Sequence, residues 1–318
     1  MLRVGLPENI PQAWLSKFPK QVQLVPIATQ SSEVQEIEFW IPPLHGKTAR
    51  LQYERLRGIK VAQSLYAGVD YMLPWISRDI TLCDGQGIHD MPVAEWVVGA
   101  ILSAVKRFPE YRDRQREEFW DGQLPGGKFP EGDEPPPHRI LGEELAGQRV
   151  MIVGYGGIGA AVEKRLQPFD VEFVRVARSA RPGVSAVSEL PKLLPQADIV
   201  VLIVPLTDET HGMMNAALFD RMKKGALLVN AARGPVVDTE ALLGALRAGH
   251  IRAVLDVTDP EPLPKGHPLW SAPNCFITPH VAGSTPGFFV RAYDFAGEQA
   301  ERYLAGKPLK NIVNQHGY

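Results

Sequence analysis

The chain has 318 residues, of which 45% are hydrophobic and 22% are charged; these are the proportions of a globular protein, and the length suggests two domains. The 34 basic and 36 acidic residues nearly cancel to a net charge of -2, so neither nucleic acid nor an anionic membrane is expected as a partner. No signal-peptide pattern opens the sequence and no apolar run is long enough to span a bilayer, which predicts a cytoplasmic protein.

The first hundred residues have the pattern of alternating strands and helices. Short β-type runs such as "VQLVPIA" at 22–28 and "IKVAQSLYAGVD" at 59–70 alternate with amphipathic stretches. The stretch "DMPVAEWVVGAILSAVKRF" at 90–108 then predicts one long, buried helix that begins at Asp90 with Pro92 in its first turn. The apolar positions at helical spacing are Val93, Val97, Ile101, Val105 and Phe108.

A second α/β series follows a segment at 121–139 that is dense in Gly and Pro and is predicted to be a loop or arm. Apolar runs of strand length suit strands buried on both faces of a parallel sheet. These runs are "RVMIVGYGG", "VEFVRVA", "ADIVVLIVP", "GALLVNAA" and "IRAVLDV". The end of the series, at 286–306, is predicted to be a closing helix with Gly306 as its stop signal.

The glycines of "MIVGYGGIGAAVEKRL" form a G-x-G-x-x-G pattern with Gly154, Gly156 and Gly159. The pattern follows an apolar strand and opens a helical stretch, and this order makes it a dinucleotide-binding fingerprint. Such glycines allow a tight turn and let the backbone approach a pyrophosphate, whose charge a helix N-terminus stabilises. The alternative is an ordinary glycine-rich turn.

The acidic residue that holds the ribose hydroxyls in an NAD site is missing from its usual place about 20 residues after the loop. Position 177 is alanine, and Arg178, Ser179 and Arg181 follow it. These donors suit the 2′-phosphate of NADP, which a carboxylate would repel. The alternative is that the arginines are solvated charges at a strand end.

Polar residues follow apolar strands in the last third of the chain. Arg233 comes after "LLVNAA", Asp256 and Glu261 lie around the end of "VLDV", and His280 comes after "NCFITP". Each alone would be an ordinary turn or structural residue, but open α/β sheets bind ligands where their strands end. Hydride transfer to a carbonyl needs these chemical types: an acid such as His for the alkoxide, a carboxylate to orient the imidazole, and a guanidinium for the substrate.

In combination, these motifs resemble the D-isomer-specific 2-hydroxyacid dehydrogenases over nearly the whole chain. The motifs are "AGVD" at 67–70, "VAEWVVGAIL" at 93–102, "VGYGGIG" at 153–159, "VPLTDET" at 204–210, "NAARGPVVD" at 230–238, "HPLW" at 267–270 and "TPHVAGST" at 278–285. The resemblance implies that His280 is the catalytic histidine, that Glu261 pairs with it, and that Arg233 binds the substrate. It also implies that the substrate carboxylate is held by the backbone amides around Ala67, Gly68 and Val69.

The resemblance also implies a cofactor-binding set. Asp256 would approach the nicotinamide carboxamide. The complete set is Gly154, Tyr155, Gly156, Gly157, Ile158, Gly159, Arg178, Ser179, Arg181, Pro205, Thr210, Ala231, Ala232, Asp256 and Gly283. Glu261 argues against the formate dehydrogenases, which have a glutamine partner for the histidine. Ala177 with Arg178 departs from the NAD-using majority and is similar to the NADPH-dependent glyoxylate and hydroxypyruvate reductases.

The fold that the resemblance implies is α/β, with two Rossmann-like domains. A doubly wound cofactor domain at 99–283 would be inserted into a flavodoxin-like substrate domain at 1–98 and 284–318. A homodimer is expected, with the helix of Trp96 and the 121–139 arm as candidate interface elements; both could equally be intramolecular. No metal is expected, because Cys83 and Cys275 lie far apart and are predicted to be buried thiols.

The sequence therefore predicts a reductase that converts a small 2-oxo acid, glyoxylate or hydroxypyruvate, to the D-2-hydroxy acid, with NADP(H) preferred and NAD(H) as the alternative. A rival is an NAD-linked dehydrogenase of another hydroxy acid such as phosphoglycerate, for which Arg50, Arg55 and Arg78 are the candidate phosphate ligands. Another is a nicotinamide-sensing binding protein without catalysis. Tyr66, beside the carboxylate loop, would either shape the substrate pocket or pack in the core.

Overall fold

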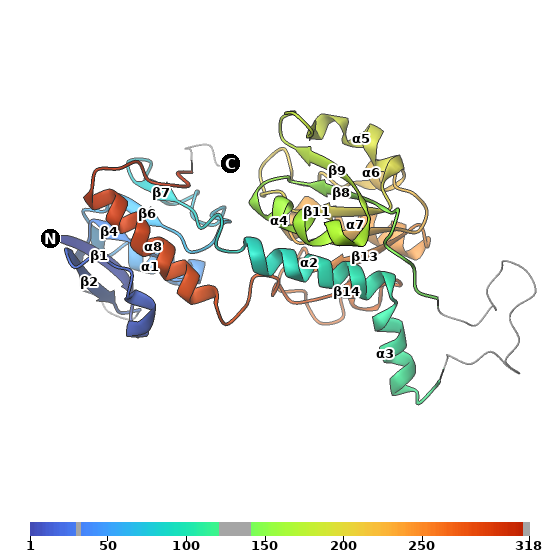
Figure 1. Cartoon of the computed structure of the whole chain (residues 1–318). Coiled ribbons are helices and arrows are strands. Elements are labelled where there is room, and N and C mark those ends of the chain that lie inside the picture. Colours follow the sequence, from blue (N-terminus) through green and yellow to red (C-terminus); the bar gives the residue numbers. More distant parts are fainter. Residues whose placement is uncertain (30–32, 121–140, 314–318) are drawn as a thin grey trace, which may run out of the picture. The chain divides into compact units, whose positions relative to one another are not determined.

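The computed structural model (Figure 1) describes residues 1–29, 33–120 and 141–313, and the arm predicted at 121–139 lies outside these residues. The chain divides into two compact units. The first unit comprises Met1–Pro92, Pro205–Glu209 and Gly283–Tyr318, and the second comprises Val93–Val204 and Thr210–Ala282. The chain thus leaves the first unit and returns to it, and the crossing positions at 99 and 283 stay a prediction.

The first unit is built on a parallel sheet with the strand order β2-β1-β4-β6-β7. This is the flavodoxin-like order, which was predicted. The strands are β1 Leu2–Pro7, β2 Val22–Ile27, β4 Phe39–Trp40, β6 Val61–Gln63 and β7 Thr81–Cys83, and β3 Gln35–Glu36 pairs separately with β5 Leu56–Arg57. The helices are α1 Gly46–Tyr53 and α8 Phe288–Leu304, with a 3-10 turn η1 at Gln12–Leu15.

Alternate residues of these strands pack on opposite faces of the first sheet, as the period of a strand requires. Phe39 and Val61 share a core with α8, whereas Trp40 and Ala62 share a core with Ala49 of α1. Both faces are therefore covered, which explains why these strands are mostly apolar.

The second unit is built on a parallel sheet with the order β10-β9-β8-β11-β12-β13-β14. The strands are β8 Arg149–Val153, β9 Glu172–Ala177, β10 Ser185–Ala186, β11 Ile199–Leu202, β12 Ala226–Asn230, β13 Ile251–Leu255 and β14 Cys275–Ile277. The order reverses between β8 and β11, as in a doubly wound fold. The predicted α/β fold class is confirmed for both units.

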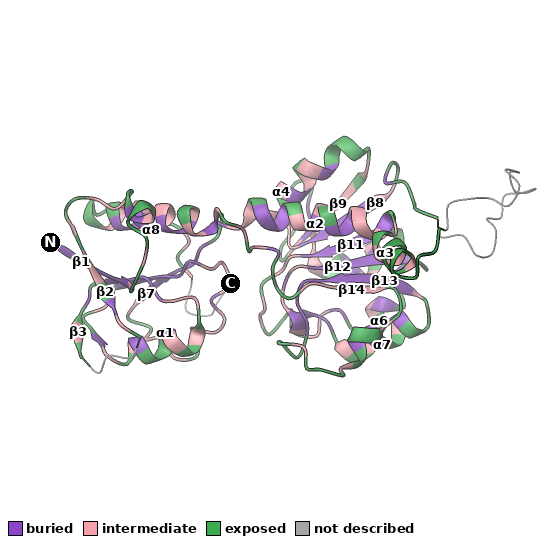
Figure 2. Cartoon of the chain, turned by 90° about the horizontal axis from the view of Figure 1, so that it is seen from below, coloured by how far each residue is buried: buried purple, intermediate pink, exposed green. Residues whose placement is uncertain are grey.

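Helices cover both faces of the second sheet. The helices of this unit that lie beside the sheet are α2 Asp90–Val105, α4 Gly157–Leu166, α5 Leu190–Leu193, α6 Ala216–Phe219 and α7 Thr239–Arg247, and α3 Phe108–Arg116 follows α2. The 3-10 turns are η3 Gln167–Phe169, η4 Val187–Glu189, η5 Leu194–Gln196, η6 Gly234–Val236 and η7 Pro268–Ser271. Figure 2 shows the buried strands between α2 and α4 on one side and α6 and α7 on the other. The apolar stripe of α2 packs into this core, as predicted.

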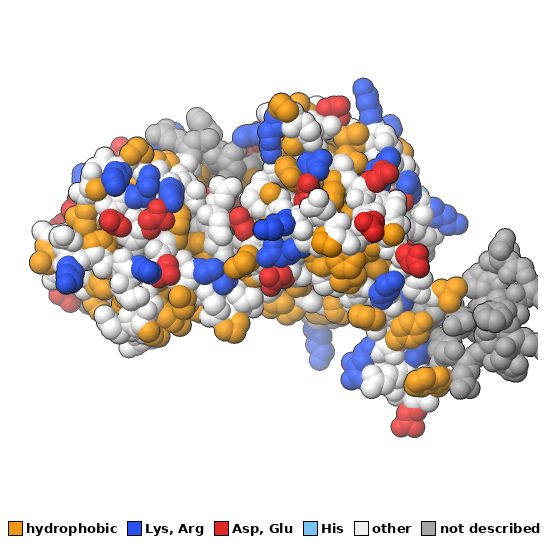
Figure 3. Space-filling view, in the orientation of Figure 1, with side chains coloured by type: hydrophobic (Ala, Val, Ile, Leu, Met, Phe, Trp, Pro, Cys, Tyr) orange, Lys and Arg blue, Asp and Glu red, His pale blue; other side chains and the backbone are white. Residues whose placement is uncertain are grey.

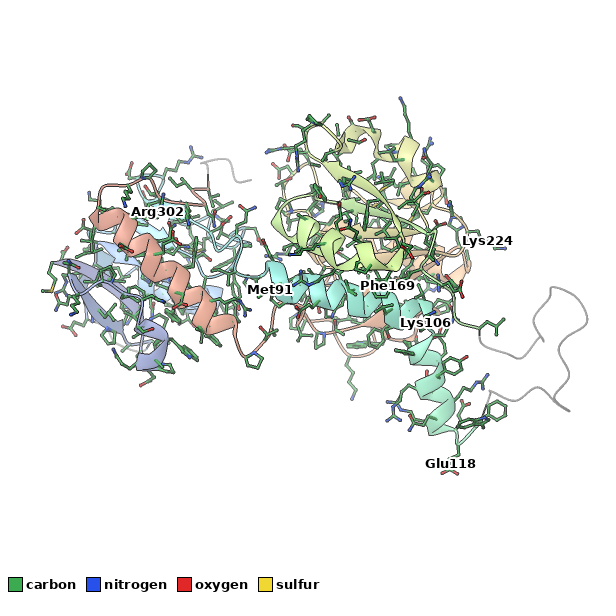
Figure 4. The ribbon with its side chains drawn as sticks, viewed as in Figure 1. Met91, Lys106, Glu118, Phe169, Lys224 and Arg302 are labelled. Atoms are coloured by element: carbon green, nitrogen blue, oxygen red, sulfur yellow. The ribbon has the colours of Figure 1, made fainter. Side chains whose placement is uncertain are left out.

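The prediction of one long helix at 90–108 is wrong at its C-terminal end. Arg107 has a left-handed backbone (φ 59°), which ends α2 and turns α3 away from the sheet. Figure 4 marks Met91 and Lys106 at the ends of α2 and Glu118 beyond α3. As a result Phe108 is 60% exposed instead of buried. The missed signal is Pro109, which has no amide hydrogen to donate to the Val105 carbonyl; the Glu143 amide donates to that carbonyl instead, at 2.7 Å.

Two smaller predictions are also corrected. The apolar run at 59–70 is a strand only over Val61–Gln63, because the Ser64 hydroxyl binds the backbone of Tyr66 and bends the chain into a loop. Cys83 is buried, but Cys275 is only partly buried.

In the described ranges, no helix is both long enough and apolar enough to cross a membrane.

Candidate active site

The carboxyl ends of β8, β11, β12, β13 and β14 meet at one edge of the second sheet, because all of these strands are parallel. The glycine loop follows β8, the Arg233 turn follows β12, Asp256 follows β13 and His280 follows β14. One edge of one unit thus carries most of the residues that were predicted to act on substrate and cofactor.

The glycine loop has the close packing that its glycines predict. Gly154 has a positive φ of 103°, and a Cβ there would lie 2.3 Å from the carbonyl oxygen of Ile203. A Cβ on Gly159 would lie 3.2 Å from Ile152 Cγ2 and 3.3 Å from Tyr155 Cδ2, so this glycine lets α4 pack closely on the strand.

The first turn of α4 fits a dinucleotide phosphate. The helix begins at Gly157, and its N-cap residue, Gly156, provides no side-chain cap for the first amides. A Cβ on Gly156 would meet nothing within 4 Å, so the space above the loop is open. Unpaired amides at a helix N-terminus attract an anion. These residues therefore fit the pyrophosphate of NAD(P).

The two arginines after β9 differ in their contacts. Arg178 and Ser179 are exposed, and the Arg178 side chain has no hydrogen bond or ion pair within the described parts of the chain. Arg181 is also exposed, but its Nη2 donates to the carbonyl oxygen of Tyr155 in the glycine loop, 2.5 Å away. A cofactor phosphate at the end of β9 would thus find Arg178 available.

His280 and Glu261 form an ion pair, with Nδ1 of the imidazole 2.5 Å from Oε1 of the carboxylate. Burial raises the pKa of the Glu261 carboxyl, but the hydrogen bond and charge of His280 and the charge of Arg233 outweigh this and leave the pKa lowered. An ionised carboxylate only accepts hydrogen bonds, so Nδ1 is the donor. The other ring nitrogen, Nε2, is left for a substrate.

His280 has a left-handed backbone with φ 53°, which is uncommon for a residue other than glycine. Asp256 explains how this conformation is held. The His280 amide donates to the Asp256 carbonyl at 2.7 Å. The Asp256 carboxylate accepts hydrogen bonds from Thr278 Oγ1 (2.6 Å), the Val281 amide (2.8 Å) and the Ala282 amide (2.8 Å). The buried Asp256 therefore anchors the turn on both sides of the histidine.

Arg233 lies on a turn that Asn230 organises. The buried Asn230 side chain accepts from the Ala232 amide at 3.0 Å and donates to the Arg233 carbonyl at 3.3 Å. The next residue, Gly234, has no room for a side chain, because a Cβ would lie 1.9 Å from the carbonyl oxygen of Thr258. The backbone at Gly234 therefore packs directly against Thr258, in the segment that leads to Glu261.

The predicted substrate-carboxylate residues belong to the first unit. Ala67 and Gly68 are partly exposed in the loop after β6, whereas the Val69 side chain is fully buried in the core. The Gly85 amide braces this loop by donating to the Tyr66 carbonyl at 2.8 Å. The Tyr66 ring stacks on Phe288 with centroids 5.9 Å apart, so it has a packing role in this unit.

The remaining predicted cofactor residues are spread over both units. Pro205 and Gly283 belong to the first unit, and Thr210, Ala231 and Ala232 to the second. Gly283 packs closely: a Cβ there would lie 2.6 Å from Cδ2 of His89.

Sequence reasoning missed the residues that position this site. Asn230 and Thr278 stand inside the quoted motifs, so proximity to Arg233 and His280 was an available signal. Within the described residues, no group of His, Cys, Asp and Glu side chains has an arrangement that could hold a metal ion.

Comparison with known proteins identifies the family. Residues 98–282 match the model of the D-isomer specific 2-hydroxyacid dehydrogenase NAD binding domain. The chain is 36% identical over 266 residues to the glyoxylate reductase of Thermofilum pendens, covering 81% of this chain and 75% of that one.

Solved structures agree with this match. A D-isomer specific 2-hydroxyacid dehydrogenase from Xanthobacter autotrophicus, in complex with NADPH and MES, is 30% identical with a TM-score of 0.78, covering 99% of this chain and 98% of that one. An NADPH-dependent glyoxylate/hydroxypyruvate reductase from Sinorhizobium meliloti, in complex with NADP and sulfate, is 25% identical with a TM-score of 0.81, covering 100% of both chains. The resemblance seen in the sequence is confirmed, and the chain belongs to the D-isomer specific 2-hydroxyacid dehydrogenase family.

Proposed function

We propose that this enzyme reduces a small 2-oxo acid, with glyoxylate or hydroxypyruvate as the substrate, to the D-2-hydroxy acid at the expense of NADPH. The observation that carries the proposal is the ion pair of His280 and Glu261 at the sheet edge that also bears Arg233 and the glycine loop. An acid, its carboxylate partner and a guanidinium are the groups that carbonyl reduction requires.

When bound, the nicotinamide would supply a hydride to the carbonyl carbon of the substrate. His280 would deliver the proton of Nε2 to the carbonyl oxygen, so that the C=O double bond becomes a C–O single bond with one new C–H bond and one new O–H bond. Glu261 keeps the imidazole oriented through Nδ1 and stabilises its positive charge. Arg233 binds the substrate carboxylate, together with the amides around Ala67, Gly68 and Val69.

The cofactor preference rests on the end of β9. Arg178 and Ser179 are exposed there, and no acidic residue follows Ala177 in the strand-end segment. A guanidinium without an internal partner favours the dianionic 2′-phosphate of NADPH. The Xanthobacter and Sinorhizobium structures are complexes with NADPH and NADP, which supports this preference.

The phosphoglycerate alternative has less support. Of its candidate phosphate ligands, Arg50 pairs with Glu54 at 3.7 Å, and Arg55 donates to the carbonyls of Leu51, Ala28 and Thr29. A binding protein without catalysis would not need the proton donor formed by His280 and Glu261.

The homodimer and the cytoplasmic location are further parts of the proposal. Helix α3 has no buried residue, and Phe108, Tyr111, Phe119 and Trp120 on and after it are 40–82% exposed. Figure 3 shows hydrophobic side chains among charged ones in the region of α3. Exposed aromatic side chains of this kind are typical of a protein interface, so α3 joins the Trp96 helix as a candidate dimer contact.

The direct test is the initial rate of nicotinamide oxidation with hydroxypyruvate and with glyoxylate, giving kcat/KM for NADPH and NADH. We expect turnover with a preference for NADPH. His280→Ala should lower kcat by about 100- to 10,000-fold, the contribution of a general acid, and leave NADPH binding intact. His250→Gln is the control, because His250 precedes β13 at the opposite edge of the sheet. Unchanged turnover in His280→Ala would refute the assignment.

A further inference from the structure

The Tyr155 side chain, in the glycine loop, is held by charged residues from two other elements. Glu163 of α4 and Arg175 of β9 form a bidentate ion pair, with Nε–Oε2 at 2.5 Å and Nη2–Oε1 at 2.6 Å. Burial and the nearby Glu163 carboxylate raise the pKa of the Tyr155 hydroxyl, and Arg175 Cζ lies over the tyrosine ring, 5.7 Å from its centre. One residue of the loop is thus tied to the helix and the strand that flank it.

The ion pair of Arg175 and Glu163 is half-buried, and each residue favours the charged form of the other. The side chains of Arg175 and Glu163 are 30% and 21% exposed. The hydrogen bond from Arg175 lowers the pKa of the Glu163 carboxyl. A bidentate pair of this kind fixes geometry as well as charge, because both donors of the guanidinium fork are engaged.

Arg181 holds the same residue through its backbone. Its Nη2 donates to the Tyr155 carbonyl at 2.5 Å, and its Cζ lies 5.9 Å from the centre of the Tyr155 ring. Two backbone hydrogen bonds with Val184, of 2.9 and 2.8 Å, fix the position of Arg181 itself. Arg181 therefore directs donors at the loop, whereas Arg178 points none at any described residue.

We propose that Arg181, Arg175 and Glu163 are positioning residues that hold the glycine loop through Tyr155, and that Arg178, not Arg181, distinguishes NADPH from NADH. The four residues Tyr155, Glu163, Arg175 and Arg181 are called the loop clamp. This inference rests on the proposed function, because it takes the loop to bind a dinucleotide. It changes the role of Arg181, which the sequence placed among the phosphate ligands.

The loop clamp and Arg178 should have different signatures. The glycine loop contacts the pyrophosphate, which NADH and NADPH share, whereas the 2′-phosphate occurs in NADPH alone. Loss of a clamp residue should weaken the binding of NADPH and of NADH by the same factor, so the ratio of the two dissociation constants should not change. Loss of Arg178 should change this ratio.

The test is a fluorescence titration of the full chain with NADPH and NADH, without any oxo acid. We expect Arg181→Met to raise the dissociation constants of both nucleotides by about tenfold, the effect of one charge-assisted hydrogen bond. Arg178→Met should raise that of NADPH by about tenfold and leave that of NADH nearly unchanged. An Arg181→Met variant that loses affinity for NADPH alone would overturn the inference.

Milder variants and a matched control separate the clamp from general stability. Tyr155→Leu removes the ring that Arg175 and Arg181 contact, and should weaken the binding of both nucleotides about threefold, as for loss of one cation–π contact. Arg149→Met is the control: Arg149 pairs with Glu172 at 2.7 Å and so joins β8 and β9 at the opposite edge. It should leave both affinities unchanged. If Arg149→Met weakens the binding of both nucleotides as much as Tyr155→Leu does, the inference is overturned.

The same titration distinguishes this inference from the proposed function. A wild-type chain that binds neither nucleotide would refute the proposed function and the inference with it. If the wild-type chain binds both nucleotides, and Arg181→Met loses more affinity for NADPH than for NADH, only the inference is refuted. Thermal unfolding of each variant without nucleotide verifies that the fold is retained.

Discussion

Nδ1 of His280 lies 2.5 Å from Oε1 of Glu261, and this contact determines which imidazole nitrogen is available for proton transfer. The pair is partly exposed, with 46% of the histidine side chain and 39% of the glutamate side chain accessible. Its strength depends on the ionised carboxylate. The carboxylate is also near Arg233, so the proposed acid, its partner and the proposed substrate-binding guanidinium form one charged group.

Replacing Glu261 tests this pairing. Glu261→Gln keeps an oxygen that can accept from Nδ1 but removes the negative charge, so the imidazolium is less stabilised. We expect kcat to fall by about tenfold or more, as for loss of a charge-assisted hydrogen bond. Steady-state rates measured from about pH 4 upwards test this expectation.

The lowered pKa of the Glu261 carboxyl determines how its contact with His280 depends on pH in the acid range. A carboxyl whose pKa is lowered by folding contributes its stabilising contact above its ordinary value of 4.5 and loses it as the pH falls through the lowered value. In the wild type the contact should therefore persist down to below pH 4.5. A profile for Glu261→Gln that coincides with the wild type would show that the charge has no part in proton transfer.

The placement of Arg233, His280 and the glycine loop at one sheet edge could be predicted from the sequence, because each follows an apolar strand within a few residues. Parallel strands bring such positions to one edge whatever the details of packing. The break at Arg107 was harder, since a left-handed arginine has no propensity signal of its own, although Pro109 was a usable one.

Residues that act through packing were not predictable. The pairing of Glu163 with Arg175 depends on how α4 lies against β9, which no local spacing encodes. The anchoring role of Asp256 depends on how the chain turns after β14. The end of the strand at 59–70 depends on the contact of Ser64 with Tyr66, which an apolar pattern does not reveal.

Asp256 should be essential for the turn that carries His280. Its carboxylate accepts three hydrogen bonds from Thr278, Val281 and Ala282. An asparagine has one acceptor oxygen, so in Asp256→Asn the amide nitrogen would face a donor. We expect a loss of about 1–3 kcal/mol in the free energy of unfolding, the penalty of unsatisfied buried groups, together with a fall in kcat. Urea unfolding and steady-state rates measure these changes.

A matched control for this substitution is available in the same unit. Asp238 caps α7 by accepting from the Ala241 amide at 3.0 Å, and asparagine caps helices about as well as aspartate. Asp238→Asn should therefore unfold like the wild type. If Asp256→Asn did so too, with normal kcat, the turn would not depend on the carboxylate.

Gly234 should tolerate no side chain. In Gly234→Ala the new Cβ would lie 1.9 Å from the Thr258 carbonyl oxygen, a backbone atom that cannot move without shifting the segment that leads to Glu261. We expect a loss of stability of about 1–3 kcal/mol or more, and a kcat/KM that falls because Arg233 and Glu261 move apart. Gly244→Ala is the control: a Cβ there meets nothing within 4 Å, and alanine in a helix should add about 0.5–1 kcal/mol. Equal effects of the two substitutions would contradict the packing argument.

Asp84, at the end of β7, should make the first unit less stable at neutral pH. The residue is 5% exposed, and burial raises the pKa of its carboxyl to about 6, although the Gln86 amide donates to Oδ1 at 2.9 Å. A carboxyl with a raised pKa contributes stability below its unfolded value of 3.8 and loses it as the pH rises through 6. The ionised form therefore costs up to about 3 kcal/mol above pH 6.

Asp84→Asn removes this cost and keeps the oxygen that accepts from Gln86. We expect the variant to be more stable than the wild type by about 1–3 kcal/mol at pH 8, and the difference to shrink towards zero near pH 4. Urea unfolding at the two pH values measures it, and Asp79→Asn, at an exposed carboxylate of the same unit, should show no such pH dependence. A variant that is less stable than the wild type at pH 8 would mean that the charged carboxylate is stabilised in the folded chain.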